Sequence, residues 1–221
     1  MPTPKADTDA AIAARLQARP LEVAILLFPE VEVLDFAGPF EVLSVAARIA
    51  RDRAHPPFRV RTVAADRVPV PARHGLPVIA NFSIAEKPPV DLLIVPGGIV
   101  DQPLGDAKTL AWLAAASKQA ALTASVCTGA FLLAKIGLLN GRNCTTHWED
   151  VPELRATYPD LTVVEHVAYV DEGAIVTSAG ISAGIDMSLH LVARVLGFNA
   201  AQATARQMQY DWKEAQEAAA A

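Results

Sequence analysis

The sequence predicts an α/β fold, in which a mostly parallel sheet is covered by helices on both faces. Two observations support this fold class. Short apolar runs of strand length alternate along the chain with stretches of helical periodicity, which is the order of elements that builds parallel sheets. The first run, Val23–Phe28, is apolar at every position, as is typical of a strand buried on both faces.

The first helix is expected to cover Phe40–Ile49, because Pro39 would then occupy the first helical turn, where proline is favoured. A small hairpin is expected from Val68–Val70 and Leu76–Ala80, around Gly75. The other predicted strands are Phe58–Ala64, Leu92–Val95, Leu122–Val126, Thr162–Val164, Val167–Val170 and Ile175–Ser178, with an extended piece at Asn143–Thr146. The other predicted helices are Thr109–Gln119, Ala130–Ile136, Pro152–Tyr158, Ser182–Leu196 and Ala200–Trp212.

The length of 221 residues favours one domain, since the sequence contains no linker, low-complexity segment or internal repeat. We divide the chain into an N-terminal extension of residues 1–20, a single domain of residues 21–212 and a tail of residues 213–221. The extension lacks the apolar core of a signal peptide, and no apolar run approaches the roughly 18 residues of a membrane span. The sequence therefore predicts a cytoplasmic protein without a membrane partner.

Charge and cysteine content argue against two functional classes. The formal net charge is −5 at pH 7, which argues against a nucleic-acid partner bound through a broad basic face. The two cysteines, Cys127 and Cys144, match neither a disulfide framework nor a zinc-ligand spacing, so we expect no metal site and two free thiols. A free thiol is either buried filler or a reagent, and its surroundings decide which.

The surroundings of Cys127 predict a reactive thiol. It lies between a predicted strand and a predicted helix, with Gly129 two positions later, and such a sharp turn lifts a side chain above the sheet. The amino end of the helix would stabilise a thiolate, so we expect the pKa of Cys127 to fall below the ordinary value of about 8.5. The alternative is a buried structural thiol. Cys144, in an extended piece, is expected to pack in the core.

Two other strand ends carry residues suited to a site. Gly97 and Gly98 follow a buried strand, where they would let a ligand approach the backbone and would present N–H groups to a developing anion. An ordinary turn is the alternative for this pair. Asp35 lies shortly after the first strand, and its carboxyl would either cap the helix expected at Pro39 or face the site as a proton carrier.

These segments together resemble the ThiJ/PfpI superfamily, whose domain is similar to that of class I glutamine amidotransferases. The resemblance runs from about Val23 to Asn199 and includes six motifs in the superfamily's order. It implies a flavodoxin-like three-layer sandwich with a nucleophile elbow after a central strand, and a homodimer. The six motifs are Leu27–Glu30, Leu34–Pro39, Ile94–Gly98, Ser125–Ala130, Thr145–Trp148 and Ala179–Asp186.

The residues around Cys127 distinguish subgroups of this superfamily. Members with protease activity have a Cys-His pair at the elbow, whereas in this chain Cys127 is followed by Thr128. This pair, together with Asp35 and the run Thr145–Trp148, resembles isonitrile hydratases. The same motifs occur in AraC-type regulators before a helix-turn-helix region, for which the nine residues after Trp212 are expected to leave no room.

The resemblance implies that Cys127 hydrates a small-molecule isonitrile to an N-substituted formamide through a thioimidate. Asp35 would donate a proton and then activate water, which requires burial to raise its pKa. The N–H groups of Gly98 and Thr128 would hold the thiolate or the developing anion, the Thr128 hydroxyl would hydrogen-bond in the site, and no cofactor is implied. His147, twenty positions after Cys127, would either pair with the thiol or be structural.

Two alternatives to this activity remain open at the level of sequence. The first is another small-molecule hydrolase, amidase or peptidase of the same superfamily. The second is a module without enzymatic activity that senses a ligand or oxidation through Cys127.

Overall fold

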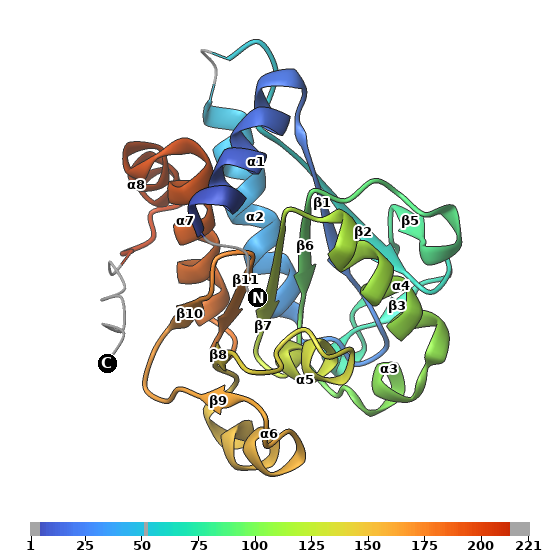
Figure 1. Ribbon diagram of the computed structural model, residues 1–221. Coiled ribbons are helices and arrows are strands. Elements are labelled where there is room, and N and C mark those ends of the chain that lie inside the picture. Colours follow the sequence, from blue (N-terminus) through green and yellow to red (C-terminus); the bar gives the residue numbers. More distant parts are fainter. Residues whose placement is uncertain (1–4, 51–52, 213–221) are drawn as a thin grey trace.

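The computed structural model describes residues 5–50 and 53–212, so the predicted tail of residues 213–221 and the first four residues of the predicted extension lie outside the described residues. A seven-stranded sheet in the order β10-β11-β7-β6-β1-β2-β5 forms the centre (Figure 1). Its neighbouring strands are parallel except for β10 and β11. The strands of this sheet are β1 (Leu21–Leu26), β2 (Phe58–Ala64), β5 (Phe82–Ser83), β6 (Leu92–Val95), β7 (Leu122–Val126), β10 (Tyr169–Asp171) and β11 (Ile175–Ser178).

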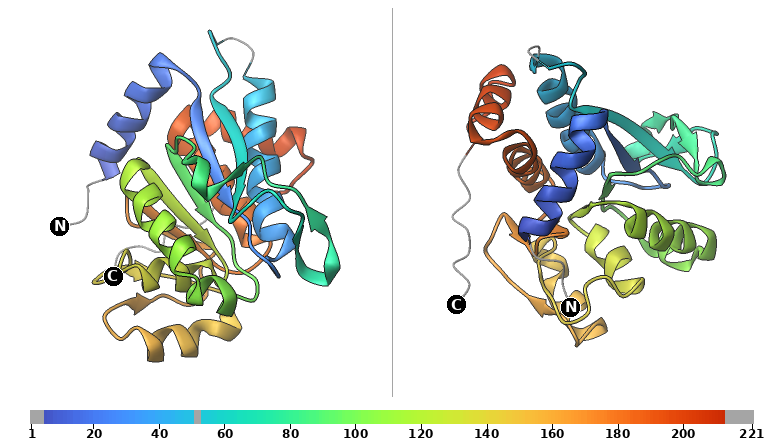
Figure 2. Two further views of the ribbon diagram at one scale, coloured as in Figure 1. Left: turned by 90° about the vertical axis from the view of Figure 1, so that its right-hand side faces the viewer. Right: turned by 45° about the horizontal axis from the view of Figure 1, so that its top comes forward.

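Helices cover both faces of the sheet and complete a three-layer sandwich, which confirms the predicted fold class (Figure 2). One face carries α2 (Val33–Ile49), α7 (Ala183–Leu196) and α8 (Phe198–Gln207). The other carries α3 (Asp101–Gly105), α4 (Ala107–Gln119) and α5 (Gly129–Lys135). The smaller elements are β3 (Val70–Pro71) paired with β4 (Pro77–Val78), β8 (Asn143–Cys144) paired with β9 (Thr162–Val163), α6 (Val151–Thr157), and 3-10 turns at Arg73–Gly75, Ile84–Glu86 and Trp148–Asp150.

The predicted strand bounds agree with the structure for four of the central strands. The bounds of β2, β6, β7 and β11 are as predicted, and the predicted hairpin is present as β3 and β4. β1 begins two residues earlier than predicted, at Leu21, and α8 ends at Gln207 rather than at Trp212. The Trp212 ring instead lies against Phe198, with ring centroids 5.4 Å apart.

The start of α2 differs from the prediction. The helix begins at Val33 rather than after Pro39, so Pro39 lies in its interior. Proline cannot donate the backbone hydrogen bond expected there, which ordinarily disfavours this position. Packing outweighs that cost, because Pro39 and Gly38 are buried and Gly38 lies close against Ile185 of α7. The earlier start places Asp35 in the first turn of α2.

An additional helix, α1 (Lys5–Ala18), forms within the predicted N-terminal extension, where the sequence analysis assigned no element. Its buried residues Thr8, Ile12 and Leu16 recur every four positions, which is the spacing of one helical face. Asp9 forms an ion pair with Arg194 of α7 at 2.6 Å. These contacts attach α1 to the rest of the fold.

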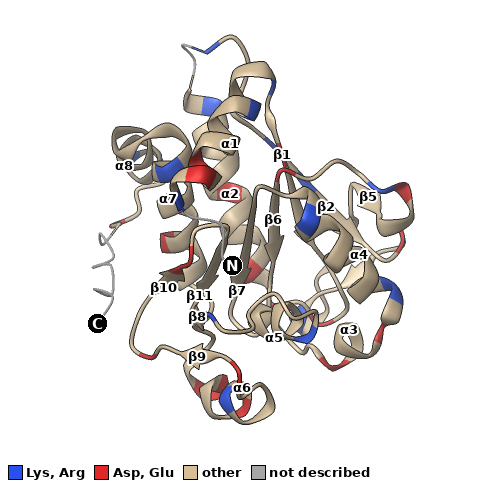
Figure 3. Cartoon of the chain, viewed as in Figure 1, with Lys and Arg blue, Asp and Glu red and all other residues tan. Residues whose placement is uncertain are grey.

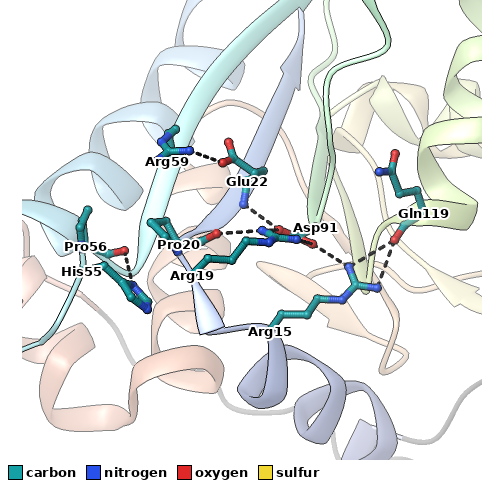
Figure 4. Close-up of polar contacts among 9 residues, drawn as sticks. All are labelled: Arg15, Arg19, Pro20, Glu22, His55, Pro56, Arg59, Asp91 and Gln119. Atoms are coloured by element: carbon teal, nitrogen blue, oxygen red, sulfur yellow. Dashed lines mark hydrogen bonds and ion pairs between the residues drawn. The ribbon is translucent and has the colours of Figure 1, made fainter. Parts of the chain in front are cut away.

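A buried ion cluster lies at the amino ends of the central strands (Figure 4). Asp91, which precedes β6, is 5% exposed and accepts hydrogen bonds from Arg15 at 2.8 Å and from the Glu22 backbone N–H at 2.9 Å. The guanidinium of Arg19 also donates to both carboxylate oxygens of Asp91. The cluster joins α1 to the sheet at the end opposite to Cys127, which follows β7.

Basic and acidic residues are intermixed along the chain in the view of Figure 3. Of the helices within the described residues, none has the length and apolar character needed to cross a bilayer.

Candidate active site

The site is built on the sharp turn that connects β7 to α5. Cys127 follows β7 directly and has a φ of 57°, a left-handed conformation that is uncommon for a residue with a side chain. A Cβ atom at Gly129 would overlap the carbonyl oxygen of Val95, so only glycine fits where α5 begins. The hydroxyl of Thr146 donates to the Cys127 carbonyl at 2.9 Å and holds the turn from the outside. The predicted nucleophile elbow is therefore confirmed.

The pKa of the Cys127 thiol moves in the direction opposite to the prediction. The residue is 7% exposed, and burial together with the charge of Asp35 raises the pKa of the thiol to about 12. Hydrogen bonds from the backbone N–H and side chain of Thr128 act the other way but are outweighed. The expectation of a pKa below about 8.5 was wrong because it counted the helix end and not the burial or the neighbouring carboxylate.

Asp35 is the neighbour that sets the chemistry of the thiol. Its side chain is 0% exposed, and its Oδ2 accepts the backbone N–H of Gly97 at 3.0 Å. Oδ1 has no hydrogen-bond partner among the described residues. Burial raises the pKa of Asp35 to about 7, and weaker interactions with the Cys127 side chain and the Ile181 N–H lower it only in part. The largest influences on this pKa include no cation.

The carboxyl of Asp35 does not cap a helix. Glu32 is the N-cap residue of α2, and the hydrogen bond of Asp35 crosses to Gly97 instead, which lies 62 positions away in the chain. Of the two roles left open by the sequence, the cap at Pro39 was wrong. The proton-carrier role agrees with a pKa of about 7.

The pair therefore rests as a thiol beside a carboxyl that is about half ionised at neutral pH. Cys127 holds its proton, while Asp35 is ready to accept one. In such a pair the carboxylate acts as the general base that activates the nucleophile, and the proton it takes is available to be given back.

The two glycines after β6 have a different role from the one predicted. The N–H of Gly97 is donated to Asp35, and the N–H of Gly98 is donated to the Thr128 hydroxyl at 2.9 Å. That hydroxyl in turn donates to the Gly98 carbonyl at 2.8 Å. Both glycine N–H groups are thus used to fix Asp35 and Thr128 rather than offered to an anion. The backbone N–H of Thr128 is the one that faces the sulfur of Cys127.

His147 lies beside the elbow without a described hydrogen bond to Cys127. Its Nδ1 is 3.3 Å from an Asp150 carboxylate oxygen, and its ring lies so close to Gly180 that a Cβ there would overlap it. Pairing of His147 with the thiol thus remains a prediction. His147 packs as one of the residues that line a neighbouring cavity.

A cavity of about 340 Å³ lies beside the turn that carries Cys127, although neither Cys127 nor Asp35 is among its lining residues. Thr146, which holds the Cys127 carbonyl, and Ile181, whose N–H faces Asp35, both line it. Sequence reasoning singled out neither residue. The signal available for Ile181 is its place in the Ala179–Asp186 motif, and the structure shows it in a left-handed conformation with a φ of 53°. A β-branched residue in that conformation is a backbone outlier.

Within the described part of the chain, no three His, Cys, Asp or Glu side chains gather closely enough to hold a metal ion.

The sequence profile of the DJ-1/PfpI family matches residues 21–194. The chain belongs to the DJ-1/PfpI family. Its fold places it there too, since the crystal structure of a ThiJ/PfpI family protein from Pseudomonas syringae superimposes with a TM-score of 0.77 at 27% identity. That match covers 87% of this chain and 76% of the other.

Two relatives illustrate the range of this DJ-1/PfpI family. Isonitrile hydratase of Pseudomonas putida is 36% identical over 191 residues, which are 86% of this chain and 78% of that enzyme. The HTH-type transcriptional regulator CdhR of Pseudomonas aeruginosa is 33% identical over 78% of this chain but only 50% of the regulator. The domain is thus similar both to an enzyme and to part of a regulator.

Proposed function

We propose that this DJ-1/PfpI protein hydrates isonitriles to N-substituted formamides, with Cys127 as nucleophile and Asp35 as the acid–base residue. The observation that carries the proposal is the buried Asp35 carboxyl beside the Cys127 thiol, with a pKa of about 7. Similarity to an isonitrile hydratase supports the choice of substrate.

The first half of the reaction adds the thiol across the isonitrile carbon. The Asp35 carboxylate takes the proton of Cys127 while the sulfur forms a bond to the terminal carbon of R–N≡C. Asp35 then gives that proton to the same carbon, which leaves the thioimidate R–N=CH–S–Cys. One proton moves from sulfur to carbon through Asp35, and the carboxylate is regenerated.

The second half consumes water. Asp35 accepts a proton from the attacking water, whose oxygen bonds to the thioimidate carbon, and passes that proton to the nitrogen. Collapse of the resulting R–NH–CH(OH)–S–Cys breaks the carbon–sulfur bond, releases R–NH–CHO and returns the hydroxyl proton to sulfur. The sum is one isonitrile and one water giving one formamide, so no cofactor takes part in the proposal.

Gly97 and Thr128 act in this proposal by position. Gly97 fixes Oδ2 of Asp35, and Oδ1, which has no hydrogen-bond partner among the described residues, would be free to take the thiol proton. The N–H of Thr128 faces the sulfur and would stabilise the negative charge that develops there.

We further propose that the protein is cytoplasmic and that it forms a homodimer. Sedimentation analysis would test the homodimer.

A second candidate function is ligand or oxidation sensing through Cys127. The observation in its favour is the similarity to half of the regulator CdhR. Sensing would require the thiol to bind or react once, whereas hydration requires many cycles.

Turnover separates these functions. We expect alkyl and aryl isonitriles to lose their infrared stretching band and to yield formamide in large molar excess over protein. Binding of one isonitrile per chain without formamide would support a sensor instead. Release of ammonia or peptide cleavage would support an amidase or peptidase.

A further inference from the structure

The cavity next to the reacting pair has the size and position of a site for part of a substrate. Its volume of about 340 Å³ lies within the range of small-molecule pockets. Neither Cys127 nor Asp35 is among its lining residues, but two lining residues contact the Cys127 backbone: Thr146 donates to its carbonyl, and the Ala179 carbonyl accepts its N–H at 3.3 Å. The group that reacts at Cys127 is only an N≡C unit, so the substituent R must lie in adjoining space, and this cavity adjoins.

The lining of this cavity is mixed, and it includes a highly exposed aromatic ring. Trp148 lines it and is 75% exposed, although large aromatic side chains are ordinarily well buried. Its ring centroid is 5.7 Å from that of His147, with the two planes tilted by 42°. Two ring faces at such an angle provide stacking and edge contacts for a third ring. Ile181, 40% exposed, lies on the same cavity.

Two of the polar side chains that line the cavity are already engaged by residues outside its lining. Glu165 pairs with Arg155 at 2.7 Å, and His147 faces Asp150 at 3.3 Å. A charged substituent would have to compete with these pairs, whereas a neutral flat substituent would cover the exposed ring of Trp148. The lining therefore favours an uncharged aromatic group.

We propose that this cavity binds the substituent of the substrate, that it selects aromatic isonitriles over small alkyl ones, and that Trp148 is a specificity-determining residue. The inference rests on the proposed hydratase function for the reacting group, but the aromatic site itself is independent of turnover.

The test compares phenyl isonitrile with isopropyl isonitrile in wild type, Trp148→Ala, Trp148→Phe and the control Phe198→Ala, which removes an exposed aromatic ring from α8. Loss of one stacking contact is expected to lower kcat/KM for the phenyl substrate about tenfold, mainly through KM. The isopropyl substrate should change less than about twofold, since it has no ring to stack. Trp148→Phe should keep most of the wild-type kcat/KM for phenyl isonitrile, and Phe198→Ala should resemble wild type. Equal loss for both substrates, or none, would overturn the proposal.

A binding experiment keeps this proposal separate from the hydratase activity. N-phenylformamide is added to Cys127→Ala, with and without Trp148→Ala, while tryptophan fluorescence is recorded. Quenching that disappears with Trp148→Ala supports the aromatic site even if no isonitrile is turned over, in which case only the hydratase proposal fails. Absence of quenching, or quenching that persists in Trp148→Ala, would overturn the site even if turnover is found.

Discussion

Asp35 and Asp91 lie at opposite ends of the sheet, and both are removed from water, with exposed fractions of 0% and 5%. Burial raises the pKa of Asp35 to about 7. Burial acts in the same direction on Asp91, but hydrogen bonds and charge from Arg19, with the Glu22 N–H and Arg15, lower its pKa overall (Figure 4). The same residue type, removed from solvent at both places, therefore has a raised pKa where the largest influences include no cation and a lowered pKa where two arginines pair with it.

This difference separates a structural carboxylate from a reactive one. Two arginines compensate the buried charge of Asp91, and the cluster joins α1 to the sheet. Asp35 instead has one backbone donor to Oδ2 and the thiol of Cys127 nearby, so its charge is poorly compensated. Poor compensation near a nucleophile is what a proton carrier needs at neutral pH.

The largest expected effect is at Cys127. Cys127→Ala should abolish hydration while the protein stays folded, because the thiol forms the covalent intermediate. Cys144→Ala is the matched control, since Cys144 is a fully buried thiol of β8 that the proposed mechanism does not use, and it should keep activity. Formamide production measures both. More than a few per cent of wild-type rate in Cys127→Ala would contradict the covalent mechanism.

Asp35→Asn should lower kcat by about 10²–10⁴-fold, the usual loss when an acid–base group is removed. Asp91→Asn, a change of the same kind at the other end of the sheet, should leave kcat within about threefold of wild type, since it touches no reacting atom. Steady-state kinetics measure both variants, and equal losses of kcat would contradict the proposed difference between the two carboxyls.

In wild type, kcat/KM should rise with pH and level off above about 7, as Asp35 ionises.

Stability should depend on pH in opposite ways through the two carboxyls. The pKa of Asp35 is higher in the folded state than in the unfolded state. The free energy of unfolding should therefore fall as pH rises from about 4 to about 7, by up to about 4 kcal/mol. The folded-state pKa of Asp91 is lowered, so its contribution is present above about pH 4 and is lost as pH falls below it. Asp35→Asn should therefore remove the loss between pH 4 and pH 7.

The corresponding change at Asp91 should lower stability at neutral pH. Asp91→Asn should cost about 2 kcal/mol, less than a fully buried ion pair, because Arg15 and Arg19 are 35% and 47% exposed. Urea unfolding at pH 5 and pH 8 measures both variants. If the free energy of unfolding of the two variants depended on pH in the same way, the proposed difference between the two carboxyls would be contradicted.

The smallest effect concerns alkylation of the two thiols. Burial raises the pKa of both, to about 12 for Cys127 and about 11 for Cys144, so neither reacts rapidly at neutral pH on that account. Cys127 should still react with iodoacetamide several-fold faster, because it is slightly exposed and Asp35 can take its proton. Intact-mass spectrometry follows the reaction, and Asp35→Asn should reduce the difference.

The sequence predicts local features of this protein well. The strands β2, β6, β7 and β11 and the elbow at Cys127 depend on residues adjacent in the chain, and their predictions are confirmed. The helix α1 also carried a readable signal in the four-residue spacing of Thr8, Ile12 and Leu16.

The pKa of the Cys127 thiol could not be predicted in this way, whereas the raised pKa of Asp35 was an expectation carried by the resemblance. The partner of Asp35 is Gly97, 62 positions away, and the partner of the Gly98 N–H is Thr128, 30 positions away. The burial that raises the pKa of Cys127 comes from packing between elements, which neighbouring residues do not specify. For that reason the prediction of a lowered pKa failed while the prediction of the turn held.

The central claim is that Asp35, unlike Asp91, titrates near neutrality in the folded protein. Carboxyl-carbon NMR of protein labelled at aspartate measures this directly, with Asp35→Asn and Asp91→Asn used to assign the two signals. We expect the Asp35 signal to titrate with a midpoint near pH 7 and the Asp91 signal to stay ionised down to about pH 4 or below. An Asp35 midpoint near its ordinary value of about 4 would contradict the account.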